Sequence, residues 1–104
     1  MASKNKTPLM RYRMHLQLEK SLQPNTVDAY LSDVNKLVDF LGGDEKALGA
    51  TLEDLRLFLA SLADVGINAR SQSRIISSLR SFYAFLKLDG FIESDPAELL
   101  RSPK

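Results

Sequence analysis

The chain of 104 residues has no cysteine, a single histidine and no long apolar run. Without cysteine it can form neither disulfide bonds nor thiolate metal sites, so a reducing compartment suits it. The opening residues, MASKNKTPLM, lack the apolar stretch of a signal peptide, and no later segment is apolar enough to span a bilayer. These absences lead us to expect a cytoplasmic chain that does not associate with membranes.

The sequence also lacks the residue groupings on which catalysis depends. There are no paired carboxylates in a matching motif, no glycine-rich loop that could hold phosphate, and no spacing that suits a metal ion. The single histidine, His15, falls near the polar side of an expected helix and is interpreted as a surface residue. Tyr12, Tyr30 and Tyr83 fall on apolar stripes and are interpreted as core residues. We therefore expect a chain that is not itself an enzyme and holds no cofactor and no metal.

The composition that remains is typical of one soluble globular domain. Hydrophobic residues make up 44% of the chain and charged residues 26%, and its length allows a modest core without covalent cross-links. Apolar residues that recur every three or four positions predict an all-α fold with four main helices and no strand. The helices are expected at about residues 8–20, from 25 or 26 to 41, 51–65 and 68–88.

Capping residues predict the boundaries of these helices. Pro24 interrupts the chain before the second helix, and Asn25 or Thr26 is expected to cap that helix. Thr51 and Asp54 have the spacing of a capping box at the start of the third helix. The other expected features are helix ends at Gly42-Gly43 and Gly66, a loop at residues 44–50 and a short helical turn at residues 96–100.

The net charge of +1 hides an uneven distribution along the chain. Residues 1–27 carry a net charge of +4, and residues 65–88 carry +4 with no acid at all. In contrast, residues 28–64 carry −5 and residues 89–104 carry −2. Two basic segments separated by an acidic one predict a folded molecule with a basic side. Such a side favours a polyanionic partner.

The stretch NARSQSRIISSLRSFYAFL, residues 68–86, contains arginine and serine but no acid. On a helical wheel at about 100° per residue, its apolar residues gather within about one third of the circle and predict a buried face. That apolar face consists of Ile75, Ile76, Leu79, Phe82, Tyr83 and Leu86. The opposite side consists of Arg70, Ser73, Arg74, Ser77, Arg80, Ser81 and Ala84.

The polar side of this helix has the chemistry of a DNA-binding surface. Arginine donates paired N–H groups to phosphate oxygens or to a guanine edge, and serine adds short phosphate contacts. A helix also fits the width of a DNA major groove. The alternative interpretation is a solvated face from which acids happen to be absent. Five serines between residues 71 and 81 favour the functional interpretation, because serine is a mediocre helix former.

Two longer stretches resemble a known family. LEKSLQPNTVDAYLSDVNKLVDFL resembles the pattern sxxTxxxYxxdLxxFxxFL, and RSQSRIISSLRSFYAFLKLDGFIESDPAELLRSPK resembles sxxRxlsalRsFyxfLxxxgxixxNPaxxlxxPk. From about Leu9 to Lys104 the chain is similar to the core-binding, SAM-like domain of tyrosine recombinases, in particular those of the Xer and phage-integrase branch. It departs from the pattern at Ser94-Asp95-Pro96, where the family has Asn before Pro, although Asp also suits a turn before a helix.

The resemblance implies the amino-terminal half of a C-shaped clamp around duplex DNA, built from two crossed helical hairpins. The second and fourth helices would face the DNA. Ser71 lies near the start of the fourth helix, where free N–H groups also favour phosphate. The family's contact positions fall on Asn25, Thr26, Ser71, Arg74, Ser77 and Arg80.

The resemblance also implies that the chemistry of recombination belongs to a downstream catalytic domain. We expect residues 1–8 to form a flexible tail, residues 9–100 the DNA-binding domain and residues 101–104 the start of a linker to that catalytic domain. The chain itself is expected to be monomeric. The whole recombinase would assemble as a tetramer on two DNA sites during DNA integration or recombination.

Two other classes of protein stay open on the sequence. The chain could be a helical protein-interaction module that uses an exposed Phe85 or Phe40 as its anchor. It could also be a small regulator that binds DNA on its own. Among recombinases, a chromosome-resolving Xer protein and a transposon or phage integrase differ in their DNA site and partner.

Overall fold

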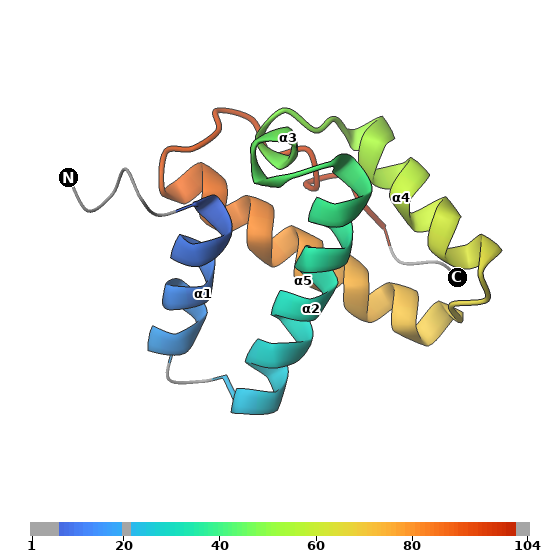
Figure 1. Ribbon diagram of the computed structural model, residues 1–104, viewed down its shortest axis with the longest axis horizontal. Coiled ribbons are helices and arrows are strands. Elements are labelled where there is room, and N and C mark those ends of the chain that lie inside the picture. Colours follow the sequence, from blue (N-terminus) through green and yellow to red (C-terminus); the bar gives the residue numbers. More distant parts are fainter. Residues whose placement is uncertain (1–6, 20–21, 102–104) are drawn as a thin grey trace.

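The computed structural model describes residues 7–19 and 22–101. Within these residues the protein is all-helical, as predicted, and the helices form two crossed hairpins. One hairpin pairs α1 with α2 and the other pairs α4 with α5, and α5 crosses behind α1 and α2 (Figure 1). The five helices are α1 (Pro8–Leu18), α2 (Pro24–Leu41), α3 (Asp44–Leu48), α4 (Leu52–Asp64) and α5 (Ala69–Leu88).

Side chains cap the starts of three helices. Thr7 Oγ1 accepts a hydrogen bond of 3.1 Å from the amide of Met10 at the start of α1. At α4 the predicted capping box is present: Asp54 N donates to Thr51 Oγ1 over 3.1 Å, and Thr51 N donates to Asp54 Oδ2 over 3.0 Å. Asn68 caps α5. These bonds satisfy amide groups that a helix leaves without an internal partner.

The start of α2 differs from the prediction that Asn25 or Thr26 caps it. The helix begins one residue earlier, at Pro24, and its flanking residue Gln23 makes no side-chain cap. Proline is well suited to the first position of a helix because it has no N–H to satisfy and its φ is already helical. Pro24 therefore opens α2 instead of preceding its cap. The left-handed Gly42, with φ of 99°, ends α2 as predicted.

The expected loop at residues 44–50 is wrong, because residues Asp44–Leu48 form the short helix α3. Two acids, Asp44 and Glu45, lie in its first turn, where the positive end of a helix stabilises them. Ala47 is fully buried, and its carbonyl accepts a hydrogen bond of 2.8 Å from the hydroxyl of Tyr83 on α5. This tertiary contact holds a helix too short to be stable alone.

The ends of the domain lie close to the predicted positions. Pro8 is buried and is the first residue of α1, as the helix expected from about residue 8 predicts, although the expected tail of residues 1–8 included it. The helix ends at Leu18, earlier than expected, because Glu19 is extended. Lys20 lies outside the described residues, as do residues 1–6 and 102–104. At the other end, residues 96–99 form a hydrogen-bonded turn in which Glu98 N donates to Asp95 O and Leu100 N donates to Ala97 O. Asp95 Oδ1 fixes this turn by accepting from Ala97 N over 2.8 Å.

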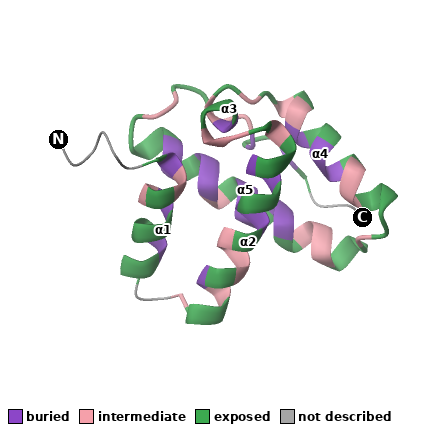
Figure 2. Ribbon diagram, in the orientation of Figure 1, coloured by how far each residue is buried: buried purple, intermediate pink, exposed green. Residues whose placement is uncertain are grey.

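The core lies where the two hairpins cross, and α5 packs most extensively against α2. Figure 2 shows the buried positions on the inward sides of the helices. All six apolar residues predicted for the inner face of α5 are buried, with Leu79 0% and Phe82 1% exposed. The segment after α5 passes α3 and contributes Ala97 and Leu100 to this core (Figure 1). Among the described helices, none is long and apolar enough to cross a membrane.

The aromatic residues follow the sequence interpretation in part. Tyr12 and Tyr83 are fully buried, but Tyr30 is only partly buried. The expectation of an exposed Phe85 is wrong: it is 8% exposed, and its ring centroid lies 5.7 Å from that of Tyr12. A phenylalanine on α5 reaches the core because α1 packs over this end of the helix. His15 is exposed, as expected, with its ring 4.8 Å from Phe85.

Candidate nucleic-acid interface

The outer side of α5 carries exposed arginines and a serine. Arg70, Arg74, Ser77 and Arg80 are all exposed, and α5 contains no acid. At about 100° per residue these four residues occupy about one third of the helix surface, opposite the buried Leu79. We call these four residues the α5 stripe. Its long cationic side chains and its small hydroxyl leave room for an extended anionic surface to approach.

The first turn of α2 holds the other two predicted contact residues. Asn25 is exposed and Thr26 is half-buried, and no side chain caps this turn. An uncapped first turn presents amide N–H groups and the positive end of the helix, both of which favour an anion. Lys36 is exposed as well and lies eleven residues after Asn25, so the two share nearly the same side of α2. The sequence interpretation did not single out Lys36, although this spacing could have indicated it.

Arg74 contacts α2 through an ion pair with Asp33. Arg74 Nε donates to Asp33 Oδ2 over 3.1 Å, and Arg74 Nη2 donates to Asp33 Oδ1 over 2.8 Å. The hydroxyl of Ser78, one turn further along α5, donates to Asp33 Oδ2 over 2.7 Å. Asp33 and Ser78 are fully buried, whereas the side chain of Arg74 is 49% exposed. The hydrogen bonds to Asp33 raise the pKa of Arg74 above its usual value, so its positive charge is permanent.

This pairing changes the role expected of Arg74. The helical wheel places Arg74 on the polar side of the helix, which predicts that its replacement leaves the fold intact. In the structure it neutralises a buried carboxylate, so it supports the packing of α5 on α2 as well as forming part of the surface. Sequence reasoning missed Asp33 and Ser78 because it considered the faces of each helix separately.

The pairing also fixes how the predicted contact residues lie relative to one another. Thr26 precedes Asp33 by seven residues, so it lies about 10 Å along α2 from the contact with Arg74. Ser77 and Arg80 follow Arg74 along the α5 stripe. The half-buried Ser71 sits at the start of α5, but its amide already donates to Asn68 Oδ1 over 2.9 Å. The amide of Ser71 is therefore not free for phosphate, and its hydroxyl is what remains available.

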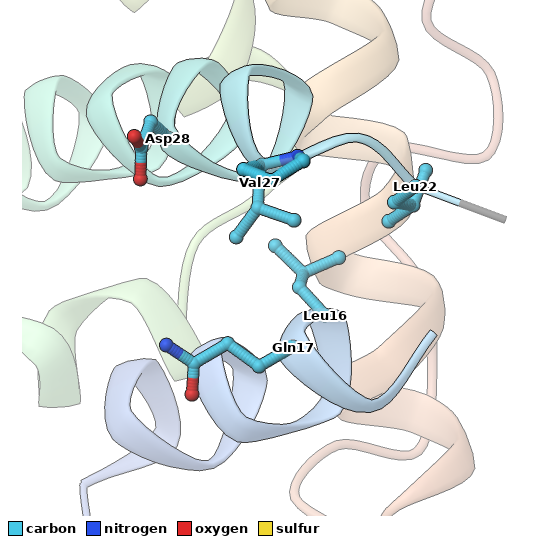
Figure 3. A pocket seen from close by; sticks show the side chains of 6 residues that line it. Leu16, Gln17, Leu22, Val27 and Asp28 are labelled. Atoms are coloured by element: carbon cyan, nitrogen blue, oxygen red, sulfur yellow. The ribbon is translucent and has the colours of Figure 1, made fainter. Parts of the chain in front are cut away.

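Two grooves lie between α1 and α2. The smaller, of about 210 Å³, lies where the side chains of Leu16 and Val27 point toward each other, with Gln17 and Asp28 beside it (Figure 3). The larger, of about 560 Å³, is lined by both polar and apolar side chains. In the larger groove the hydroxyl of Ser32 accepts a hydrogen bond of 3.1 Å from Lys36. In the described part of the chain no three His, Asp or Glu residues are grouped to hold a metal ion. The α5 stripe and its α2 neighbours are therefore the stronger candidate site.

These features define the class of protein: an all-α domain of two crossed hairpins in which the exposed side of α5 is basic. Residues 9–90 match the family described as phage integrase, N-terminal SAM-like domain, and the chain belongs to that family. The match covers α1 to α5. It confirms the resemblance that was recognised on the two sequence stretches.

Curated relatives and a solved structure agree with this family. The chain is 41% identical over 92 residues to the tyrosine recombinase XerC of Oceanobacillus iheyensis, covering 86% of this chain and 30% of that protein. It is 37% identical over 90 residues to the tyrosine recombinase XerD of Rhizobium meliloti, covering 86% and 29%. The integrase from mycobacterium phage Brujita superposes with a TM-score of 0.76 at 22% identity, covering 92% of this chain and 32% of that one. The chain thus spans about 30% of the length of these recombinases.

Proposed function

We propose that this domain binds duplex DNA and serves as the N-terminal half of the DNA clamp of a site-specific tyrosine recombinase. The surface that binds DNA is the α5 stripe together with the first turn of α2. Five of the six predicted contact residues belong to it, and the sixth, Ser71, lies next to Arg70 at the start of α5. The recombinase would use this domain to hold its site during DNA integration or recombination. Family membership and the recombinases among the relatives support the proposal.

The observation that carries the proposal is the exposed, acid-free side of α5. Arg70 and Arg80 project there, and within the described residues neither makes an ion pair. Because no acid in the described part of the domain pairs with them, the guanidinium groups of Arg70 and Arg80 are free to bind an anion. A DNA backbone supplies one phosphate charge for about every 1.7 Å of duplex axis, which suits a stripe of this kind.

The structure weakens the alternative of a protein-interaction module, because Phe85, one of the two residues expected to anchor a partner protein, is buried. Phe40 is 46% exposed, but its ring lies 5.4 Å from Phe58 and packs against α4. The alternative of a stand-alone regulator shares the same DNA-binding surface. Our proposal differs from a stand-alone regulator because the domain would be part of a larger recombinase. That recombinase would carry out strand exchange and assemble as a tetramer on two DNA sites. It would act on DNA in the cytoplasm.

An NMR titration with a short DNA duplex tests the proposal. Amide shifts should cluster on the first turn of α2 and on the α5 stripe, and the exposed side of α4 serves as the internal control. Affinity should be about micromolar or weaker and should fall steeply with salt, because phosphate contacts release counterions. Shifts that cluster on α4, or an affinity that does not depend on salt, would refute the proposed surface.

A further inference from the structure

Asp33 is a buried acid in direct contact with the proposed DNA-binding surface. Its two carboxylate oxygens accept hydrogen bonds from Nε and Nη2 of Arg74, and Ser78 on α5 holds the same carboxylate. We propose that Asp33 is a positioning residue for DNA binding, which fixes the Arg74 guanidinium so that its remaining donors face a phosphate. This inference rests on the proposed function, because it concerns the same surface.

The N–H donors of Arg74 divide between Asp33 and the proposed DNA phosphate. A guanidinium has five N–H groups in one plane, and Asp33 uses one on Nε and one on Nη2. Two N–H groups on Nη1 and one on Nη2 remain available for a phosphate. Because the group is planar, fixing one edge also fixes the direction of the opposite edge. With its side chain 49% exposed, Arg74 can hold Asp33 and contact a phosphate at the same time.

The burial of Asp33 keeps Arg74 in place. If the arginine swung out toward solvent, it would leave a fully buried carboxylate without its counter-charge, which is strongly unfavourable. The side chain is therefore ordered before DNA arrives, so binding does not have to immobilise it. Ser78 adds a second constraint, since it fixes the carboxylate relative to the helix that carries Arg74.

A positioning role and a purely electrostatic role predict opposite effects of removing the Asp33 charge. The pair has no net charge, so Arg74 adds little to long-range attraction. If charge alone mattered, Asp33→Asn would remove a negative group near the phosphates and DNA binding would become tighter. If positioning matters, the same substitution frees the guanidinium and DNA binding becomes weaker.

The experiment is a double-mutant cycle on affinity for a short duplex, measured by fluorescence anisotropy well below the melting temperature of each variant. Asp33→Asn should weaken binding by about threefold to tenfold, the cost of immobilising one long side chain. Arg74→Gln should weaken binding at least as much, and adding Asp33→Asn to it should cause no further loss. Tighter or unchanged binding of Asp33→Asn, or an equal loss in the Arg74→Gln background, would overturn the positioning role.

The wild-type protein provides a second measurement, which does not depend on whether Asp33→Asn folds. The Nε–H resonance of Arg74 should stay in slow exchange and shift little when DNA is added, while the Nη resonances shift. Faster exchange of Nε–H on adding DNA would mean that Arg74 leaves Asp33, and the positioning role would be wrong.

Arg80→Gln distinguishes failure of this inference from failure of the proposed function. If the wild type shows no salt-dependent binding and Arg80→Gln has no effect, the proposed function fails and the positioning role fails with it. If Arg80→Gln weakens binding while Asp33→Asn does not, the DNA-binding surface stands and the positioning role alone is overturned.

Discussion

Arg74 on α5 and Asp33 on α2 form a two-bond ion pair in which the acid is fully buried and the arginine is half exposed. We expect Arg74→Ala to lower the free energy of unfolding by about 1–3 kcal/mol. The loss is below the value for a completely buried pair, because water can enter where the guanidinium was and solvate the carboxylate. Chemical denaturation of the two proteins measures this difference.

Arg80→Ala is the matched control for that substitution. Arg80 is exposed on the same helix, and its replacement should change stability by no more than about 0.5 kcal/mol. Equal stability of the Arg74→Ala and Arg80→Ala variants would show that the ion pair contributes nothing measurable to the fold.

The stripe arginines should contribute more to DNA binding than the N-terminal lysines Lys4 and Lys6, which lie outside the described residues. Arg80→Ala should weaken binding by several-fold and reduce its salt dependence, since it removes a phosphate contact held on a rigid helix. Lys4→Ala should have a smaller effect. Anisotropy titrations at two salt concentrations compare them, and an equal or larger loss for Lys4→Ala would count against the α5 stripe.

Core and surface residues of α5 should respond differently to truncation. Phe82 is 1% exposed, and Phe82→Ala should cost about 3–5 kcal/mol through the cavity it leaves. Ser77 is exposed, and Ser77→Ala should melt at nearly the same temperature as the wild type because alanine is the better helix former. With DNA present, the lost hydroxyl should cost about 0.5–1.5 kcal/mol of binding. Thermal melts with and without duplex test both expectations.

If Ser77→Ala unfolded the domain and Phe82→Ala did not, the assignment of the buried and exposed faces of α5 would be wrong.

Much of this fold was predictable because its signals are local. The apolar repeat along α5 and the capping box of Thr51 and Asp54 depend on residues a few positions apart, and both predictions are confirmed. α3 was missed because its five residues depend on a bond from Tyr83, which is 36 positions away from Ala47. For the site, the exposure of Arg70, Ser77 and Arg80 followed from the helical wheel. The ion pair of Arg74 with Asp33 could not be predicted in this way, because Asp33 lies on another helix, 41 positions away in the sequence.

The buried phenol of Tyr12 should make the domain less stable in alkali. Burial raises the pKa of Tyr12 to about 12 from its usual 10.0, although the hydrogen bond to Ser81 acts in the opposite direction. The unfolded chain therefore releases this proton first as the pH rises. The stabilising contribution is complete below about pH 10 and is lost between pH 10 and about 12, at up to about 1.4 kcal/mol per pH unit.

Chemical denaturation at pH 8 to 11 measures that loss against a variant without the phenol. Tyr12→Phe should start about 1 kcal/mol less stable at pH 8, because the bond to Ser81 is lost, but its stability should fall less steeply above pH 9. Burial also raises the pKa of Tyr83, so the double variant with Tyr83→Phe should have a shallower profile still. A Tyr12→Phe profile as steep as that of the wild type would mean that this phenol does not govern the alkaline transition.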